Sequence, residues 1–476
     1  MGGKYEKRPN IILILTDDQG PWAMGCAGNR EIRTPNLDRL ANTGVRFENF
    51  FCTSPVCSPA RASLLTGRIP SQHGVHDWIQ KGNIGKNSIE YLKRQLAYTD
   101  VLAENGYTCG ISGKWHLGDS FRPQKGFSHW YVHQRGAGPY YGAPMIRNGK
   151  LVNEPGYITD LITDDALSYL DKQAQNERPF YLSVHYTAPH APWIGNHPEE
   201  IVDSYDDCPF DSCPQEPDHP WIRTDITAYI RKDVRENLQA YFAAVTAMDM
   251  NVGRIIDKLK ELDLQKSTLV CFLSDNGFSF GHHGFWGKGN GTFPLNMYEN
   301  SVRVPAIFSH PGSIPQSIVC DELVSGYDFM PTLLDYVGLK NPEADRLPGR
   351  SFLPLLLGKR AESREHVVVY DEYGPVRMIR TKEYKYVHRY PYGPHELYDL
   401  VNDPGEYDNL INDSSKRRML TPLRAMLQSW FMTYVDPKFD GVYEPVTGLG
   451  QVHLSGPEAG GVRSFAGETE SMQHSP

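Results

Sequence analysis

The strongest candidate for chemistry in this sequence is Cys57, which opens residues 57–67, Cys-Ser-Pro-Ala-Arg-Ala-Ser-Leu-Leu-Thr-Gly. Pro59 fits the first turn of a helix, and Gly67 fits a helix stop. Such a helix places Cys57 at its N-terminus, where backbone N–H groups and the helix dipole attract anions. Arg61 lies one turn further along the same face. We therefore expect Cys57 to have a lowered pKa and to be reactive, with a structural cysteine as the alternative.

Two pairs of oxygen-bearing side chains form a second group of candidates. Asp17 and Asp18 follow an apolar run near the N-terminus, and Asp275 and Asn276 follow another one much later. Hard oxygen donors without Cys or His select calcium or magnesium over zinc. Clustered carboxylates also need a cation to offset their mutual repulsion. The sequence therefore predicts a Ca²⁺ or Mg²⁺ site, unless these acids merely cap helices.

Cationic and imidazole side chains complete the set of candidates. Lys114 and His116 flank Trp115, so on a strand they would point to the same face. His190 lies in a loop between two prolines, and Lys288 lies between two glycines. Taken alone, a lysine is usually a solvated charge and a histidine is often structural. A catalytic role for these four residues is therefore expected only if they lie beside the other candidates.

The elements that must position these residues are strands of a buried sheet. The apolar runs 10–15, 179–184 and 267–273 each end abruptly in polar residues. Continuous apolar runs suit strands covered on both faces, as in parallel sheets. Open α/β sheets place their sites beyond the carboxyl ends of the strands, so we expect the polar clusters to converge there. A stripe of apolar residues at helical spacing over 235–262 predicts a long core helix.

The character of the sequence changes near residue 363. Short runs rich in Val, Tyr and Ile over 365–400 predict a small antiparallel sheet, and residues 414–431 predict a helix. The tail after residue 436 is rich in Gly and Pro and is expected to be irregular. The predicted fold is α/β, a large mixed and mostly parallel sheet flanked by helices. A catalytic domain would span 1–362 and a C-terminal subdomain 363–476.

Composition limits the partners and the location. The 476 residues include 48 Lys and Arg against 57 Asp and Glu, a net charge of −9, without a basic stripe for nucleic acid. No apolar run approaches the length of a membrane span, and the N-terminal run is too short for a signal peptide. We therefore expect no nucleic acid and no membrane as partner, and a cytoplasmic location as written, although a trimmed secreted chain would look the same. The sequence does not indicate the oligomeric state.

The segment at Cys57 resembles the signature of type I sulfatases, Cys-x-Pro-x-Arg followed by Thr-Gly, without a departure. Further blocks resemble sulfatase motifs in the expected order: Asp17-Asp18, Gly-Lys-Trp-His-Leu-Gly at 113–118, Thr-Ala-Pro-His at 187–190, Asp-Asn-Gly at 275–277 and Gly-Lys-Gly at 287–289. The resemblance spans roughly residues 8–310 and implies an alkaline-phosphatase-like fold.

The resemblance also implies roles for individual residues. A maturation enzyme, a further expected partner, would oxidise Cys57 to formylglycine, whose hydrate is the nucleophile and whose oxygen joins Asp17, Asp18, Asp275 and Asn276 as calcium ligands. By resemblance, calcium and Lys114 hold the sulfate, Asp275 and His116 accept protons, and His190 or Lys288 protonates the leaving group. Arg61 is a further cation that the sequence provides for the sulfonyl oxygens.

The substrate prediction is a sulfated small molecule or oligosaccharide. Trp193, Trp221 and His283 are the candidate substrate contacts, because aromatic faces near the long insertion 203–221 suit sugar rings. Our specific expectation is a 6-O-sulfated N-acetylglucosamine of glycosaminoglycan or mucin. The alternatives are a phosphonate monoester or phosphodiester hydrolase with the same nucleophile, a non-catalytic glycan-binding protein, and a thiol hydrolase that uses unmodified Cys57.

Overall fold

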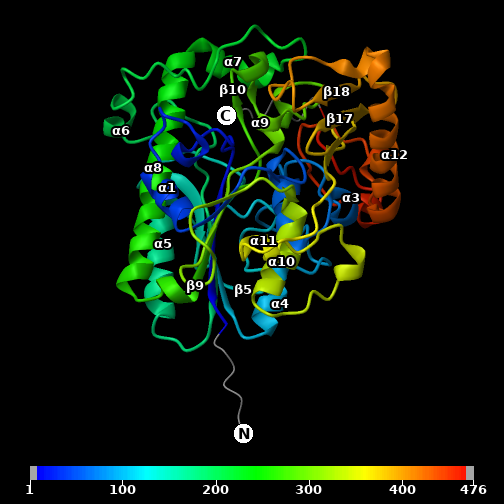
Figure 1. Cartoon of the computed structure of the whole chain (residues 1–476). Helices are drawn as coiled ribbons and strands as arrows, with labels where there is room; N and C mark the ends of the chain where they lie inside the picture. Colours follow the sequence, from blue (N-terminus) through cyan, green and yellow to red (C-terminus); the bar gives the residue numbers. More distant parts are fainter. Residues whose placement is uncertain (1–7, 468–476) are drawn as a thin grey trace.

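The computed structural model describes residues 8–467, which form a ten-stranded sheet covered by helices and a four-stranded sheet beside it (Figure 1). In the large sheet the strands follow the order β13 (Ile318–Cys320), β2 (Gly44–Phe47), β12 (Ala306–Ser309), β9 (Thr268–Ser274), β1 (Asn10–Thr16), β8 (Phe180–His185), β4 (Thr108–Gly113), β5 (Phe127–His133), β6 (Ala143–Arg147) and β7 (Lys150–Glu154). The strands from β9 to β5 are parallel, whereas β12 and β6 pair antiparallel with their neighbours. The predicted mixed, mostly parallel sheet is confirmed.

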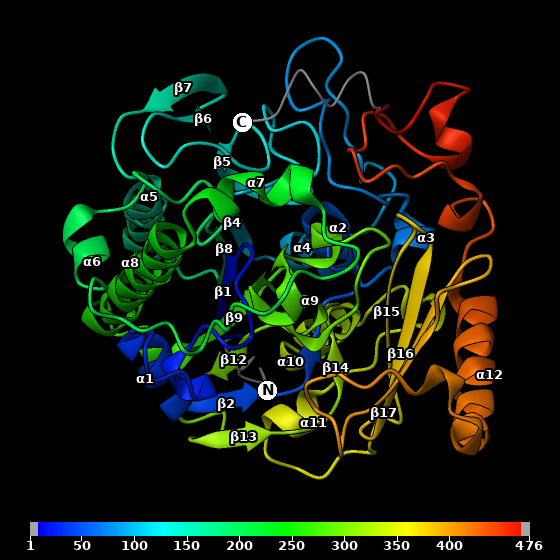
Figure 2. The same cartoon turned by 90° about the horizontal axis from the view of Figure 1, so that it is seen from above.

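The large sheet separates two hydrophobic cores. Strand β1 is buried along its whole length, with Ile11, Leu13 and Leu15 in one core and Ile12 and Ile14 in the other. This alternation follows from the two-residue period of a strand. One face is covered by α1 (Pro35–Asn42), α5 (Ile158–Gln173) and α8 (Val234–Glu261), and the other by α2 (Cys57–Thr66), α4 (Tyr98–Glu104) and α10 (Phe329–Tyr336), as Figure 2 shows.

The long helix predicted over 235–262 is α8, which differs by one residue at each end. The N-terminus of α1 is held by this helix and not by the side chain of Thr34. The Asp249 carboxylate of α8 accepts hydrogen bonds from the backbone N–H groups of Asn36 (3.1 Å) and Leu37 (2.7 Å). Two helices on the same face of the sheet are thereby fixed to each other.

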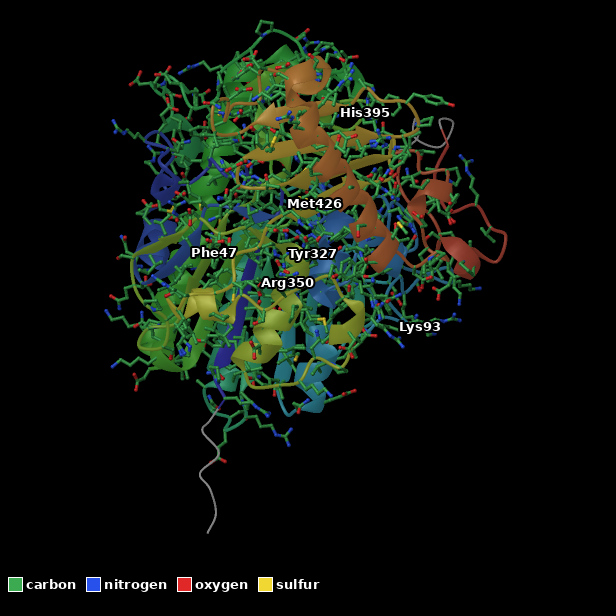
Figure 3. The ribbon with its side chains drawn as sticks, turned by 45° about the vertical axis from the view of Figure 1, so that its right-hand side comes forward. Phe47, Lys93, Tyr327, Arg350, His395 and Met426 are labelled. Atoms are coloured by element: carbon green, nitrogen blue, oxygen red, sulfur yellow. The ribbon has the colours of Figure 1, made fainter. Side chains whose placement is uncertain are left out.

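The four-stranded antiparallel sheet and the helix predicted beyond residue 363 are confirmed. They are β15 (Val367–Asp371), β16 (Val376–Arg380), β17 (Tyr384–Arg389), β18 (Glu396–Asp399) and α12 (Arg417–Tyr434). Trp430 of α12 packs 6.1 Å from the ring of Tyr327, which lies before α10, so α12 is joined to the part of the chain that carries the large sheet. Figure 3 labels Tyr327 and, on α12, Met426.

The remaining short elements connect these layers. They are β3 (Phe50–Phe51), β10 (Ser279–Phe280), β11 (Trp286–Gly287), β14 (Val324–Ser325), α3 (Pro70–His73), α6 (Glu199–Asp203), α7 (Thr224–Lys232), α9 (Glu299–Val302) and α11 (Leu353–Leu356). The tail after α12 contains only 3-10 turns and isolated bridges, as predicted, up to the last described residue. Within the described part of the chain, no helix combines the length and apolar character needed to cross a membrane.

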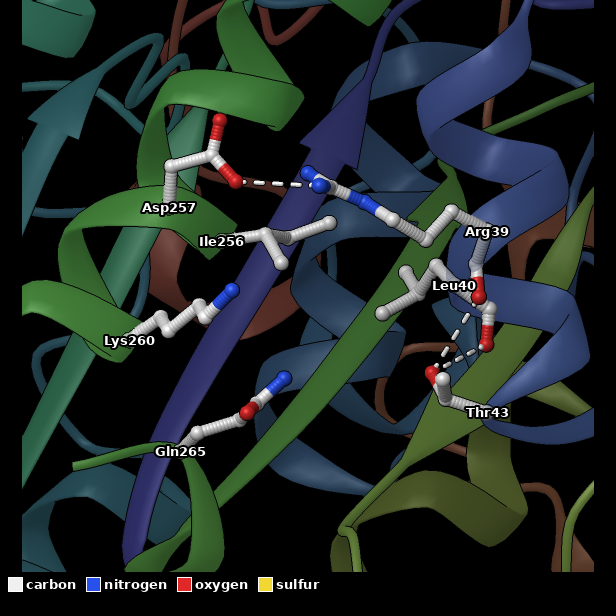
Figure 4. A pocket seen from close by; sticks show the side chains of 7 residues that line it. All are labelled: Arg39, Leu40, Thr43, Ile256, Asp257, Lys260 and Gln265. Atoms are coloured by element: carbon white, nitrogen blue, oxygen red, sulfur yellow. Dashed lines mark hydrogen bonds and ion pairs between the residues drawn. The ribbon is translucent and has the colours of Figure 1, made fainter. Parts of the chain in front are cut away.

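A surface cavity of about 180 Å³ lies between α1 and α8 (Figure 4). Its lining residues are Arg39, Leu40, Thr43, Ile256, Asp257, Lys260 and Gln265. Arg39 and Asp257 form an ion pair of 2.9 Å beside it. Gln265 precedes the first residue of β9, so the cavity lies toward the amino end of that strand. The predicted site residues follow the other end, and the cavity is not part of that site.

Candidate functional site

The carboxyl ends of β1 and β9 bring the predicted metal ligands together. Their last residues, Thr16 and Ser274, are partners in the strand register. Asp275 therefore lies beside Asp17, and its N–H donates to Thr16 O (3.1 Å). The backbone of Asp18 turns sharply at a φ of 62°, and its N–H donates to Asp275 Oδ1 (3.5 Å).

The four residues Asp17, Asp18, Asp275 and Asn276 form what we call the acidic cluster. Asn276 Nδ2 donates to Asp18 Oδ1 (2.7 Å). Asp17 Oδ1 and Asn276 Oδ1 are buried and have no hydrogen-bond partner among the described residues. Ligand atoms of Asp17, Asp18 and His190 lie within 4.8 Å of one another. Buried acceptors without a donor are rare, and this set of oxygens fits a hard divalent cation.

Three cations from different elements face the acidic cluster. None of the six charged side chains in these pairs is more than 9% exposed. Buried charges are tolerated only when they are paired and hydrogen-bonded. The pairs are Lys114–Asp17, Lys288–Asp18 (Nζ–Oδ1 2.6 Å) and Arg61–Asp275 (Nε–Oδ2 2.8 Å).

The acids of the cluster differ in the direction in which their pKa is shifted. Burial acts to raise the pKa of Asp17, but Lys114 and His190 outweigh it, and the pKa is lowered. Burial, helped by the charge of Asp17, raises the pKa of Asp275 in spite of Arg61. Asp275 is therefore the member of the cluster better suited to accept a proton.

Cys57 is the first residue of α2, with Val56 as the N-cap and Gly67 at the C-cap with a φ of 66°, as the sequence predicted. The predicted lowering of its pKa is wrong. Cys57 is 4% exposed, and burial raises the pKa of its thiol more than Lys114 and Lys288 lower it. An unmodified thiolate is therefore disfavoured as the nucleophile.

Lys114 and His116 both reach the site, but not by alternation along a strand. Strand β4 ends at Gly113, and His116 has a φ of 55°. Its Nε2 bonds to Ile79 O (3.0 Å), whereas Nδ1 is buried without a partner in the described structure. Burial and the charge of Lys114 hold the pKa of His116 well below its usual value, so the ring is neutral.

His190 is the most exposed of the predicted catalytic side chains. Its side chain is 25% exposed, and Nε2 lies 3.6 Å from Asp18 Oδ2. Its Nδ1 bonds to Ala191 O (2.6 Å), which leaves Nε2 directed at the acidic cluster. This ring therefore borders both the cluster and solvent.

The predicted substrate contacts are not brought to the acidic cluster as a group. Trp193 is 1% exposed, and its indole donates to Pro189 O (2.6 Å), so it is part of the core. His283 stacks on Tyr298 at 3.8 Å. Trp221 lies under the guanidinium of Arg389 (4.9 Å). In the described structure, no hydrogen bond or ion pair joins these three residues to the cluster.

Sequence reasoning missed Tyr229, the aromatic residue that faces outward at this place. Its ring stacks on Trp193 (5.9 Å, 30°), and the residue as a whole is 46% exposed. Its hydroxyl is close enough for Asp18 and Lys288 to act on its pKa, which burial raises. A single tyrosine on the short helix α7 gives no pattern in the sequence that would single it out.

Comparison with known proteins gives two family matches. Residues 9–339 match the model described as Sulfatase. Residues 281–432 match the model described as N-sulphoglucosamine sulphohydrolase, C-terminal. Together the two models cover the large sheet, the acidic cluster, the four-stranded sheet and most of α12.

Individual proteins are similar along most of the chain. The N-acetylglucosamine-6-O-sulfatase of Bacteroides thetaiotaomicron is 28% identical, over 90% of this chain and 87% of that protein. A solved structure in complex with its substrate D-glucosamine-2-N,6-O-disulfate has a TM-score of 0.78 and 26% identity, over 92% of this chain and all of that chain. The phosphonate monoester hydrolase of Agrobacterium radiobacter shares the fold, with a TM-score of 0.67 and 20% identity, over 89% of this chain and 96% of that chain.

Proposed function

The chain belongs to the sulfatase family, and from this membership we propose that it removes the 6-O-sulfate of an N-acetylglucosamine-type sugar. The observation that carries the reaction is the position of Cys57, at a helix N-terminus where Lys114 and Lys288 both act on it. The sugar is supported by the similar N-acetylglucosamine-6-O-sulfatase and by the similar structure with a glucosamine disulfate.

Formylglycine at position 57 is the proposed nucleophile. It would be made from Cys57 by a maturation enzyme. One hydroxyl of its hydrate would attack sulfur and displace the alcohol, and loss of the proton of the second hydroxyl would then break the C–O bond to the bound sulfate. Sulfate leaves and the aldehyde forms again, ready to be rehydrated, so water never attacks sulfur. The raised pKa of the buried thiol supports this proposal over a thiol hydrolase. Mass spectrometry of the peptide that contains residue 57 would detect the aldehyde; an intact thiol in active enzyme would contradict it.

Calcium is the proposed metal, with magnesium as the alternative, because the donor set is dominated by oxygens. The acidic cluster and the oxygen of residue 57 would hold it, and the bound ion would place positive charge on a sulfate oxygen. The unpartnered Asp17 Oδ1 and Asn276 Oδ1 support this fit. Lys114 and Lys288, which pair with Asp17 and Asp18, would be the residues placed to bind sulfate oxygens once a bound ion offset the charge of the acids.

The proton transfers are proposed from the environment of each group. Asp275, with its raised pKa, accepts a proton as the nucleophile attacks. His116 accepts the proton of the second hydroxyl of the hydrate. It uses the lone pair of Nδ1, because Nε2 is bound to Ile79 O. His190 borders solvent and Lys288 is buried beside Asp18, and either of them protonates the departing alcohol.

Tyr229 is the proposed contact for the sugar ring. The residue is 46% exposed, and one face of its ring stacks on Trp193, whose indole is bound next to His190 at Pro189 O. Aromatic faces bind the apolar faces of sugars, and Trp193 is too buried to do so itself. We therefore replace Trp193 by Tyr229, which stacks on it, as the proposed aromatic contact for the sugar.

Turnover of a substrate panel tests the proposed function. The fully matured enzyme with calcium would be assayed on 6-O-sulfo-N-acetylglucosamine, its 3-O- and 4-O-sulfated isomers, an aryl sulfate and an aryl phosphonate monoester. We expect the highest kcat/KM on the 6-O-sulfated sugar. Because a phosphonate monoester hydrolase shares the fold, a higher kcat/KM on the phosphonate would overturn the proposed reaction. A preference for another sulfate position would overturn only the proposed sugar.

A further inference from the structure

The tail that follows α12 returns to the segment after the Cys57 helix. Asp436 N–H donates to Ser71 O (3.0 Å), and Ser455 Oγ donates to Gly74 O (2.6 Å). Gly450 N–H donates to the carboxylate of Asp77 (3.2 Å). Figure 2 shows this tail in orange and red beside α3. The last described part of the chain is therefore bound to a segment that lies next to the site.

Gln451 makes the densest set of these contacts. It is fully buried and forms an isolated bridge with Ile79, bonding to residues on both sides of it. Four hydrogen bonds run from His76 N–H to Gln451 Oε1 (2.9 Å), from Gln451 Nε2 to Gly74 O (3.0 Å), from Gln451 N–H to Trp78 O (2.7 Å) and from Gln80 N–H to Gln451 O (2.9 Å). The backbone around Ile79 is thereby fixed in place.

Ile79 in turn holds the imidazole of His116. Its carbonyl oxygen lies 3.0 Å from His116 Nε2. A carbonyl oxygen only accepts, so Nε2 carries the hydrogen of the neutral ring and Nδ1 keeps the lone pair. On the other side, Ile79 N–H donates to Ser58 Oγ (3.0 Å), which donates to His116 O (3.0 Å). Ile79 is thus fixed from the Cys57 helix by Ser58 and from the tail by Gln451.

We propose that Gln451 is a positioning residue that acts through Ile79 to fix the tautomer and orientation of His116. The proposed consequence for catalysis rests on the proposed function, in which His116 Nδ1 accepts a proton. The tail thereby contributes to the site without touching the substrate. Ordered partners behind a functional histidine commonly determine which of its nitrogens is available.

Gln451→Leu is the primary variant, because it keeps the size of the side chain and removes the side-chain hydrogen bonds to His76 N–H, Gly74 O and His453 O. The backbone bonds of residue 451 to Trp78 and Gln80 remain, so the variant tests what the side chain adds to them. On the best sulfate ester of the wild-type enzyme, kcat should fall by about 10- to 100-fold, as for other residues that orient an active-site group. KM should change little, since the cations and the acidic cluster are untouched. The matched control is Ser464→Ala, which removes a bond inside the tail, Ser464 Oγ to Leu454 O (2.7 Å), and should leave kcat unchanged.

A double-mutant cycle separates positioning from a general structural effect. If Gln451 acts through His116, then adding Gln451→Leu to the His116→Ala variant should lower kcat by less than about twofold. Full, additive losses in the double variant would overturn the proposal. If Gln451→Leu fails to fold, Gln451→Glu replaces it, because the carboxylate keeps an acceptor for His76 N–H while losing the donor to Gly74 O.

The ¹⁵N shifts of the His116 ring provide a readout that needs no turnover. The wild-type protein should show a protonated Nε2 and an unprotonated Nδ1, assigned by the signals lost in His116→Ala. Gln451→Leu should move this pattern toward a mixture of tautomers, whereas Ser464→Ala should not. An unchanged pattern in Gln451→Leu would overturn the proposal. A wild-type enzyme inactive on every sulfate ester would instead contradict the proposed function.

Discussion

Each acid of the cluster is matched by a cation from a different part of the chain. Asp275 is the member that burial affects most visibly, because its pKa is raised although Arg61 lies 2.8 Å away. Buried pairs of this kind stabilise little by themselves, but removing one partner leaves an uncompensated charge. At the residue scale, the acidic cluster is therefore suited to bind a cation, and a single substitution in one of its ion pairs should destabilise the site.

Asp275→Asn should weaken metal binding and activity together. In the wild-type protein, calcium at 100 times its Kd should stabilise the fold by about 2.7 kcal/mol, and the variant should lose most of this gain. Thermal unfolding with calcium and with a chelator measures the effect. The control is Asp249→Asn, a buried acid of α8 that holds α1, which should keep the full calcium-dependent gain. An undiminished gain in Asp275→Asn would contradict the ligand assignment.

Gly136→Ala should disturb His116 directly. A methyl group at Gly136 would lie 2.2 Å from Cε1 of the His116 ring, so the ring or the loop must move. A displacement of about 1 Å at a catalytic group can cost about 100-fold in rate, and we expect a fall in kcat of that order. Steady-state kinetics measure it, with Gly156→Ala as the control, because its methyl group would come no closer than 3.3 Å to Leu161. Full activity of Gly136→Ala would show that His116 has more freedom than the structure indicates.

At the scale of elements, the sequence was sufficient to predict where a site residue lies wherever an apolar run ends in polar residues. The apolar runs that became β1 and β9 placed Asp17 and Asp275 at one edge of the sheet, because parallel neighbours end together. Lys114 and His116 did not follow the strand pattern, because β4 ends before them. Contacts such as Ile79 with His116 join irregular segments, and no period in the sequence encodes them.

The segment around Asp77 should carry a pH dependence of stability. Burial raises the pKa of Asp77 to about 7, although the N–H groups of Trp78 and Gly450 oppose this. In the unfolded chain the same carboxyl titrates near 4. The folded state therefore binds the proton more tightly. The resulting stabilisation is fully present below pH 4 and is lost as the pH rises through 7, by up to about 4 kcal/mol.

Asp77→Asn tests this dependence, because the amide cannot ionise. The variant also loses an acceptor for an N–H group, but that cost is constant with pH. Urea unfolding at pH values from 4 to 8 should show that the stability of the variant, relative to wild type, improves from pH 4 to about pH 7 and then levels off. A difference that does not vary with pH would refute the raised pKa.

At the scale of the whole molecule, a buried lysine joins the four-stranded sheet to the catalytic part. Lys385 of β17 is fully buried, and its Nζ lies 2.8 Å from Glu299 of α9 and 2.5 Å from Glu406. Its Nζ also donates to Met297 O (2.8 Å). Glu406 in turn accepts from Glu299 N–H (2.7 Å), so this network connects segments from both parts of the chain.

Lys385→Met should destabilise the protein by about 3–5 kcal/mol, because buried Glu406 loses its cation and Glu299 keeps only the longer pair with Arg380 (3.7 Å). Urea unfolding measures the loss. Lys382→Met is the matched control on the neighbouring turn, since Lys382 is 41% exposed and pairs with Glu322 at the surface. That substitution should cost less than about 1 kcal/mol. Equal effects of the two substitutions would show that the buried network does not join the two parts.

The burial of residue 57 constrains the order of events during biosynthesis. Once α2 and the segment near Ile79 have closed, only 4% of Cys57 is exposed, which leaves an oxidising enzyme no access to the thiol. Gln451 leaves the ribosome long after Cys57, separated from it by most of the length of the chain. An enzyme that converts Cys57 would therefore have to reach it before the chain closes around residue 57, which it could do while the tail is still being translated.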